Sequence, residues 1–189
     1  MASSERSARA GPRAVTPNST GDTVMSVINN SINIPLDELE VGTKFRSPGG
    51  TVTESDVVMF CMFTGNWIEI HSNKEYAERT RWGERIVQGM LTFSLISGLL
   101  QFGPAIQANY GVDKMRFLNP VKIGDTVYAS AEVIAKKEKD DKFGVGTMLI
   151  QAYNQRGEVV QRSEWSLLML RKRADLEALI AEAQPEFKV

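Results

Sequence analysis

The sequence predicts a single α+β domain in which an antiparallel sheet wraps around a central buried helix. Residues 89–102 are apolar on more than one helical face, which is typical of a buried helix. Four segments of strand length follow, at residues 106–118, 125–137, 143–154 and 159–170. The chain has 189 residues, and one hydrophobic core is enough for a chain of this length.

The elements that precede the buried helix are shorter and are predicted from their ends. A first strand is expected near Lys44–Arg46. Thr53 is typical of a helix start, and Gly65 of the end of that helix. A second capping pattern at Ser72–Glu75 predicts a short helix that runs to about Thr80. The segment between these two helices contains the only histidine and is expected to be a short polar loop.

The two ends of the chain are predicted to lie outside this domain. Residues 1–35 are expected to be a disordered leader and an extended arm, since the leader is rich in Ser, Ala and Arg and lacks an apolar face. The domain is expected over residues 36–172. Residues 173–189 are expected to form a helix on the surface, over Arg173–Ala183, followed by a tail.

Charge, cysteine content and hydropathy argue against several classes of protein. Lys and Arg number 22 against 23 for Asp and Glu, so no basic excess predicts nucleic-acid binding. The single cysteine, Cys61, is expected to be a buried core thiol, and no Cys/His spacing predicts a metal site. No apolar run reaches the roughly 18 residues that cross a bilayer, so no membrane partner is expected. A reducing compartment, the cytoplasm, is the expected location.

Four short motifs follow one another in the first half of the chain. They are GNWIEIH at residues 65–71, EYA at 75–77, RIVQGML at 85–91 and SLIS at 94–97, and DKMRFLNPVKIGD follows at 113–125. Their order and spacing resemble the MaoC-like hot-dog dehydratases, the (R)-specific enoyl-CoA hydratase group. The resemblance covers about residues 40–170 and implies a single hot-dog domain.

The resemblance implies reversible addition of water to the double bond of a trans-2-enoyl thioester. His71 would be the acid/base, a backbone N–H near Gly89 and Met90 would polarise the thioester carbonyl, and Ser97 would support the loop. A helix N-terminus suits the second role, because its unpaired donors and positive dipole end stabilise the enolate charge. The substrate would be an acyl-CoA or an acyl-carrier thioester, with no metal or redox cofactor.

The sequence departs from the family pattern at four positions, and at two of them Ile68 replaces the family asparagine and Glu69 the family proline. The family aspartate falls on Asn66, whose amide orients a water but cannot take its proton. If the loop is extended, Glu69 and His71 project to the same face, and Glu69 supplies the missing carboxylate. The alternative is that Glu69 faces solvent, which is the common case. The family histidine before Gly-Met is Gln88, which is expected to pack or to form a hydrogen bond.

Further contacts with the substrate are predicted beside these motifs. Trp67 is expected to cap the pocket or an interface, and Ile70 and Met90 are expected to contact the substrate. Lys114 and Arg116 precede a turn and are candidates to meet the phosphates of coenzyme A. Charged residues at strand edges are more often solubility devices, so that alternative stays open for both.

Three functions therefore remain open at the level of sequence. The first is an acyl-CoA hydratase/dehydratase. The second is a thioesterase of the same fold, in which water attacks the thioester carbonyl. The third is a non-catalytic acyl-CoA-binding homologue that has lost the family aspartate. In each case a homodimer is expected, since open edge strands are commonly protected by pairing between subunits.

Overall fold

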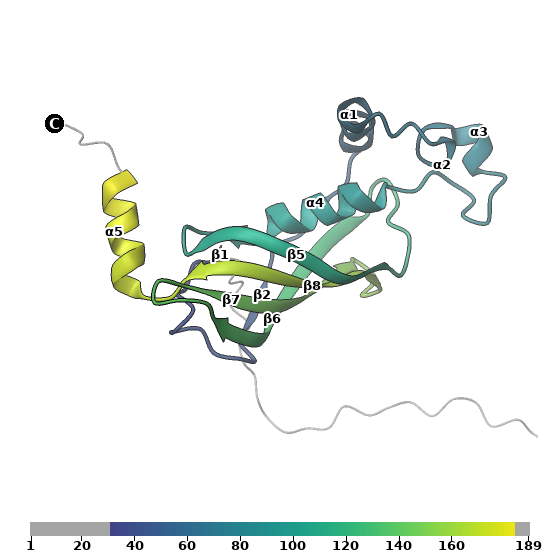
Figure 1. Ribbon diagram of the computed structural model, residues 1–189. Coiled ribbons are helices and arrows are strands. Elements are labelled where there is room, and N and C mark those ends of the chain that lie inside the picture. Colours follow the sequence, from purple (N-terminus) through teal and green to yellow (C-terminus); the bar gives the residue numbers. More distant parts are fainter. Residues whose placement is uncertain (1–30, 184–189) are drawn as a thin grey trace, which may run out of the picture.

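The structure of the protein is a computed structural model, which describes residues 31–183 (Figure 1). The predicted leader, most of the predicted arm and the last six residues lie outside the described residues. The elements in chain order are β1 Ser31–Ile32, β2 Lys44–Arg46, β3 Gly50–Thr51, α1 Glu54–Thr64, α2 Glu69–Ser72, α3 Lys74–Ala77, α4 Gly89–Leu99, β4 Gln101–Phe102, β5 Ile106–Phe117, β6 Thr126–Glu138, β7 Phe143–Asn154, β8 Val159–Leu170 and α5 Arg173–Ala183.

An antiparallel sheet forms one layer of the fold. Its strand order is β2-β6-β7-β8-β5, and β3 pairs with the start of β6. The four long strands expected from the alternating pattern are all present, and every pair between them is antiparallel. Strands β7 and β8 form a hairpin, and the turn between them includes Gly157 at a φ of 78°. Strand β5 lies at one edge of the sheet.

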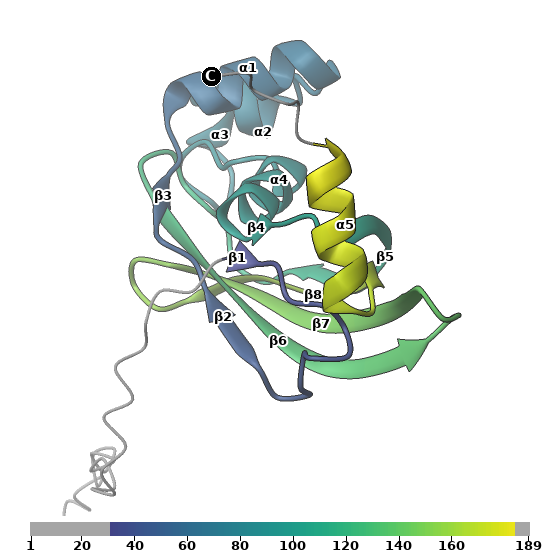
Figure 2. The same ribbon diagram turned by 90° about the vertical axis from the view of Figure 1, so that its left-hand side faces the viewer.

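Helix α4 lies across the concave face of the sheet (Figures 1 and 2). It buries Leu91, Thr92 and Ile96, and its Phe93 ring packs against Trp165 of β8 with 5.0 Å between ring centroids. Trp165 is itself fully buried, so the helix and the sheet share one core. The predicted hot-dog architecture, a sheet wrapped around a helix, is confirmed.

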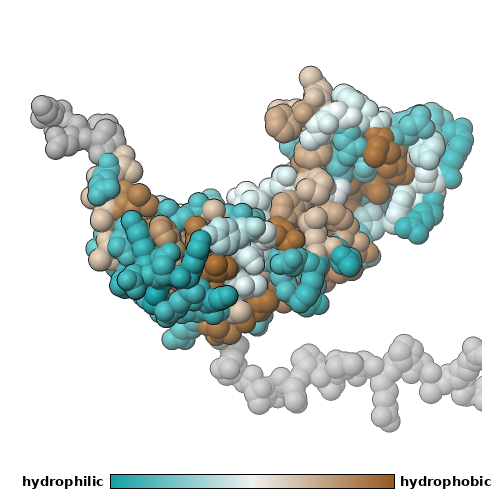
Figure 3. All heavy atoms as spheres, in the orientation of Figure 1, coloured by the Kyte–Doolittle hydropathy of each residue, from teal (hydrophilic) through white to brown (hydrophobic). Residues whose placement is uncertain are grey.

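The outer side of α4 differs from the prediction. Met90, Ser94 and Gly98, one turn apart from each other, are exposed, although the sequence predicts burial on all sides. The apolar composition of a helix does not tell whether the residues that bury it belong to the same chain or to another. Within residues 31–183, no part of the chain buries this face of α4. Figure 3 shows the surface hollowed above α4, between α5 and the segment α1–α3.

The predicted helix ends are largely confirmed. Thr53 and Asp56 form the predicted capping box at the start of α1, and Gly65 ends α1 at a φ of 72°. The second cap is Asn73 rather than Ser72: the side-chain oxygen of Asn73 accepts from the Tyr76 N–H. Helix α3 is therefore shorter than predicted and ends at residue 77.

Helix α5 has the predicted bounds and docks through Leu176 and the partly buried Ile180. Leu176 is buried in a small cluster with Ala105 and Leu170, away from the main core. The rest of the helix is mostly exposed, as expected for a surface helix. None of the helices within residues 31–183 has the length and apolar character needed to span a membrane.

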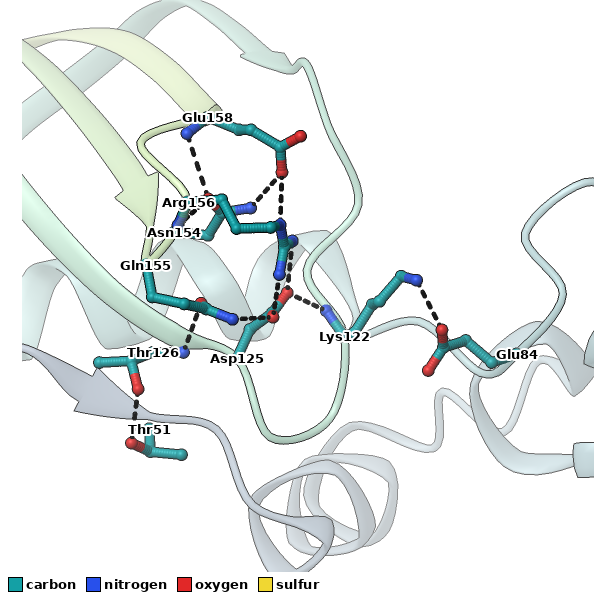
Figure 4. A network of polar contacts seen from close by, with 9 residues as sticks. All are labelled: Thr51, Glu84, Lys122, Asp125, Thr126, Asn154, Gln155, Arg156 and Glu158. Atoms are coloured by element: carbon teal, nitrogen blue, oxygen red, sulfur yellow. Dashed lines mark hydrogen bonds and ion pairs between the residues drawn. The ribbon is translucent and has the colours of Figure 1, made fainter.

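A polar network joins the start of β6 to the hairpin between β7 and β8 (Figure 4). The Asp125 carboxylate accepts hydrogen bonds from Arg156 Nη1 at 2.8 Å, Gln155 Nε2 at 2.7 Å and the Lys122 N–H at 3.0 Å. Arg156 also donates through Nε to Glu158 at 2.9 Å. Because Asp125 is almost fully buried, these donors are needed to compensate its charge.

This network predicts a loss of stability in acid. Burial alone would raise the pKa of Asp125, but hydrogen bonds from Arg156, the Lys122 backbone and Gln155 outweigh it and lower the pKa from 3.8 to about 2. A depressed pKa contributes stability that is present above the unfolded value and is lost as the pH falls through the folded value. We expect a loss of about 1–2 kcal/mol between roughly pH 5 and pH 2, since Arg156 is partly exposed.

Urea unfolding across this pH range, for wild type and Asp125→Asn, measures the effect. The asparagine keeps the side-chain shape but does not titrate, so the difference in unfolding free energy between the two proteins should shrink as the pH falls. Equal pH slopes in the two proteins would contradict the assignment of this acid sensitivity to Asp125.

Candidate active site

A cavity of about 270 Å³ opens between the N-terminus of α4, the segment 81–87 and the end of β5. Its walls are mainly apolar and carry few polar groups, as is usual for small-molecule sites. The lining residues are His71, Arg81, Trp82, Ile86, Val87, Gly89, Thr92, Phe117, Leu118, Asn119, Pro120, Val121 and Val160.

His71 lies in this cavity with its tautomer fixed by the backbone. Its Nδ1 lies 2.7 Å from the Ile86 carbonyl oxygen. A carbonyl only accepts, so Nδ1 carries the proton in the neutral ring, and Nε2 keeps a free lone pair. The Ile86 N–H in turn donates to the Ile70 carbonyl at 3.3 Å, which ties the histidine turn to the strand-like segment that leads into α4. A ring held in this way is able to accept a proton at Nε2.

The N-terminus of α4 supplies a second polar group to the same cavity. The helix begins at Gly89, and its N-cap residue Gln88 makes no side-chain capping bond. In the described part of the chain, no acceptor is hydrogen-bonded to the N–H groups of Gly89 and Met90. A β-carbon at Gly89 would lie 2.9–3.0 Å from the Phe117 ring, so glycine lets the ring approach the start of the helix this closely without a shift of either. Unpaired N–H groups at a helix start suit a developing negative charge.

Asn66 is held by its backbone rather than by its side chain. Its carbonyl accepts from the Cys61 thiol at 3.1 Å, and that sulfur accepts from Gln88 Nε2 at 2.9 Å. Cys61 and Gln88 are each 1% exposed, so the predictions of a core thiol and of a hydrogen-bonded Gln88 are confirmed. The chain of contacts joins the end of α1, the loop at residue 66 and the start of α4. Asn66 itself is not part of the cavity lining.

This buried pair leads to a prediction about stability. Cys61→Ala would remove the nearer acceptor of Gln88 Nε2 and leave it only the Val57 carbonyl at 3.5 Å, while Gln88 Oε1 already lacks a partner. We expect a loss of about 1–3 kcal/mol in the free energy of unfolding, the usual cost of an unsatisfied buried group. Cys61→Ser, which keeps a donor and an acceptor, should lose less. Urea unfolding of both variants measures this, and an alanine variant as stable as the serine variant would contradict it.

The predicted extended loop around His71 is instead a helical turn. Residues 69–72 form α2, so Glu69 and His71, two positions apart, do not project to the same side. Glu69 is exposed and does not line the cavity. The argument that Glu69 supplies the missing carboxylate therefore fails, because it required an extended backbone at residues 69–71.

Three further residues predicted to lie at the substrate pocket, and Ser97, which is predicted to support the loop, lie outside the cavity lining. Trp67 and Met90 are about half exposed, and Ile70 is partly buried next to His71. Ser97 is two turns along α4 from the helix start and is partly buried. None of these four belongs to the lining residues, so their predicted contacts remain predictions.

The two predicted phosphate contacts are engaged elsewhere. Lys114, at a φ of 50°, forms an ion pair with Glu164 at 2.9 Å. Arg116 donates from Nη1 to the neighbouring Met115 carbonyl at 2.7 Å. Both are exposed and neither lines the cavity, which agrees with the alternative that they keep an edge strand soluble.

Comparison with known proteins now adds to this geometry. Residues 37–153, more than half of the chain, match the family model of the MaoC like domain. The chain belongs to the MaoC-like family. The predicted resemblance is thereby confirmed. The cavity at the histidine turn and the start of the central helix is the site on which a functional proposal is based.

Curated relatives of this MaoC-like chain include named dehydratases and hydratases. The 3-hydroxybutyryl-CoA dehydratase of Methylorubrum extorquens is 40% identical over 100 residues, which is 52% of this chain and 62% of that protein. The (R)-specific enoyl-CoA hydratase of Rhodospirillum rubrum is 37% identical over 84 residues, 44% of this chain and 58% of that protein. Protein MaoC of Klebsiella aerogenes is 37% identical over 95 residues, but only 28% of its length is covered.

Solved structures agree with the fold. The monoamine oxidase regulatory protein from Archaeoglobus fulgius has a TM-score of 0.70 and 34% identity, covering 77% of this chain and 99% of that one. The R-hydratase PhaJ1 from Pseudomonas aeruginosa has a TM-score of 0.62 and 33% identity, covering 74% and 88%. A double hotdog protein from Mycobacterium tuberculosis, at 17% identity and a TM-score of 0.67, supports the fold alone.

The structure adds residues to the MaoC-like site that were not predicted from the sequence. Arg81 and Trp82 reach the cavity from the turn after α3, and Phe117 and Leu118 reach it from the end of β5. A signal was present for the second pair, because the FLNP turn lies in one of the family motifs. Arg81 and Trp82 lie between two motifs, and only the folded chain brings them beside His71.

Proposed function

We propose that the protein is a hydratase/dehydratase that adds water reversibly to a trans-2-enoyl thioester. The observation that carries the proposal is that His71, with a free Nε2, and Gly89, at the open N-terminus of α4, line the same cavity. One group is able to move a proton, and the other is able to stabilise a negative charge. Hydration of an enoyl thioester needs both.

In the proposed mechanism, His71 Nε2 takes a proton from water while the water oxygen bonds to the β-carbon. The electrons of the double bond move toward the thioester carbonyl, whose oxygen accepts hydrogen bonds from the N–H groups near Gly89 and Met90. The proton then returns to the α-carbon, which completes the addition of water. In the neutral ring, the bond from Nδ1 to the Ile86 carbonyl makes Nε2 the nitrogen that accepts the proton.

Asn66, Glu69 and Ser97 have secondary places in this proposal. The side-chain amide of Asn66, if it reaches the bound water, would orient it without accepting its proton. Ser97 would support the loop. The hypothesis that Glu69 supplies the missing carboxylate loses its support, because in α2 its side chain does not lie on the same side as that of His71. Glu69→Gln tests that role, and full activity in this variant would remove it.

We also propose that the protein acts as a homodimer. Strand β5 is an edge strand of 12 residues, and most of its side chains are exposed. Phe117 and Leu118 at its end, and Met90 on α4, are large apolar side chains that the described chain leaves about half exposed. Pairing of such an edge with a second copy would protect it. Light scattering after size exclusion measures the mass, and a monomer at micromolar concentration would contradict the proposal.

The test of function uses a panel of trans-2-enoyl-CoA esters of increasing chain length. Loss of the conjugated absorbance and release of free thiol are recorded in parallel. Hydration predicts loss of absorbance without thiol. Release of thiol would instead identify a thioesterase, and tight acyl-CoA binding without either signal would identify a non-catalytic homologue, which the asparagine at position 66 keeps as the second candidate.

A further inference from the structure

The active-site cavity carries one permanent charge. Of its lining residues only His71 and Arg81 are able to be charged, and only arginine is charged at every working pH. The Arg81 guanidinium lies over the Trp82 ring, with 4.2 Å from its central carbon to the ring centroid. Both residues line the cavity, so the stacked pair is part of its wall. Stacking restricts the long side chain and leaves the edge of the guanidinium plane available for hydrogen bonds.

The cations next to Arg81 are neutralised, and Arg81 is not. Arg79 pairs with Glu75 at 3.6 Å, Lys122 pairs with Glu84 at 2.6 Å, and Arg85 pairs with Glu54. Within residues 31–183, Arg81 forms no ion pair and donates no hydrogen bond. Arg81 is thus an exposed cation, stacked on an aromatic ring beside an apolar cavity, that has no acidic partner in the described chain.

We propose that Arg81, supported by Trp82, binds a phosphate group on the carrier arm of the thioester substrate. This inference rests on the proposed function and adds the residue that recognises the far end of the substrate. The planar guanidinium fork matches phosphate oxygens, and the apolar walls suit the uncharged part of the substrate. The role falls to Arg81 instead of Lys114 and Arg116, which lie outside the cavity lining.

Two carriers offer this chemistry: coenzyme A, and a carrier protein with a phosphopantetheine arm. The test compares trans-2-butenoyl esters of pantetheine, phosphopantetheine and coenzyme A, of which the first has no phosphate. For Arg81→Gln we expect KM for the coenzyme A ester to rise about tenfold, the effect of losing one charge-assisted hydrogen bond, with kcat unchanged. KM for the pantetheine ester should not change.

Three matched variants define the effect. Arg81→Lys keeps the charge without the planar fork and should recover part of the loss. Arg79→Gln removes an exposed arginine two residues away that already has a partner, and Lys114→Gln removes the alternative cation; neither should alter KM. Raising the ionic strength should increase KM more steeply in wild type than in Arg81→Gln, since screening acts on the charge that the variant lacks.

The outcomes separate the carriers and separate this inference from the proposed function. A rise in KM for both phosphorylated esters places Arg81 on the phosphate shared with carrier proteins, and a rise for the coenzyme A ester alone places it on the nucleotide phosphates. An unchanged KM for both overturns the inference while hydration stands. If wild type turns over none of the esters, the proposed function fails, and calorimetry with coenzyme A decides instead: affinity must fall about tenfold in Arg81→Gln.

Discussion

Replacing His71 by asparagine is expected to lower kcat/KM for enoyl-CoA hydration by about 10² to 10⁴, the usual range for removal of a general acid/base. The asparagine amide is able to donate to the Ile86 carbonyl in place of Nδ1, so the local fold should survive while the Nε2 lone pair is lost. Initial rates from the loss of conjugated absorbance, at several substrate concentrations, measure the effect.

The matched control for this variant lies in the same helical turn. Glu69→Gln changes an exposed side chain outside the cavity and should keep most of the activity. Circular dichroism and urea unfolding of His71→Asn should resemble wild type. A folded His71→Asn protein with wild-type kcat/KM would rule out the proposed acid/base role, whatever the result at residue 69.

Replacing Gly89 by alanine is expected to lower kcat/KM about ten- to a hundredfold. The new β-carbon would lie 2.9–3.0 Å from the Phe117 ring, so either the ring or the start of α4 must move. Overpacking of this kind costs about 1–3 kcal/mol, and here the displaced groups are the wall of the cavity and the proposed donor to the thioester oxygen. Steady-state kinetics with the best ester of the panel measures the change.

A second substitution tests the cause of that loss. Phe117→Leu removes the ring atoms that the alanine would meet, so the double variant should recover part of the activity lost in Gly89→Ala. If Phe117→Leu brings no recovery, contact with this ring is not the reason for glycine at position 89. Gly98→Ala, in the same helix but with open space at the β-carbon, should be close to wild type.

Local patterns were sufficient for most of the fold. The alternation of apolar residues predicted the four long strands, because side chains on a strand point to opposite faces in turn. Thr53 and Gly65 predicted the ends of α1, because capping depends on neighbouring residues only. The histidine turn was mispredicted because its conformation does not depend on neighbouring residues alone. The four residues of α2 are too few to show a helical period, and their conformation is supported by a bond to Ile86, 15 residues away.

Sequence patterns were enough to identify the family, the sheet, the central helix and the two residues, His71 and Gly89, on which the proposed chemistry depends. The folded structure was needed to show which nitrogen of His71 is free in the neutral ring, that a β-carbon at position 89 would meet the Phe117 ring, and that Arg81 in the cavity wall has no ion-pair partner among the described residues. The physical reason is the range of the interactions. Capping and periodicity act between near neighbours in the chain, whereas a tautomer, a close approach and an unmatched charge depend on groups that only folding brings together.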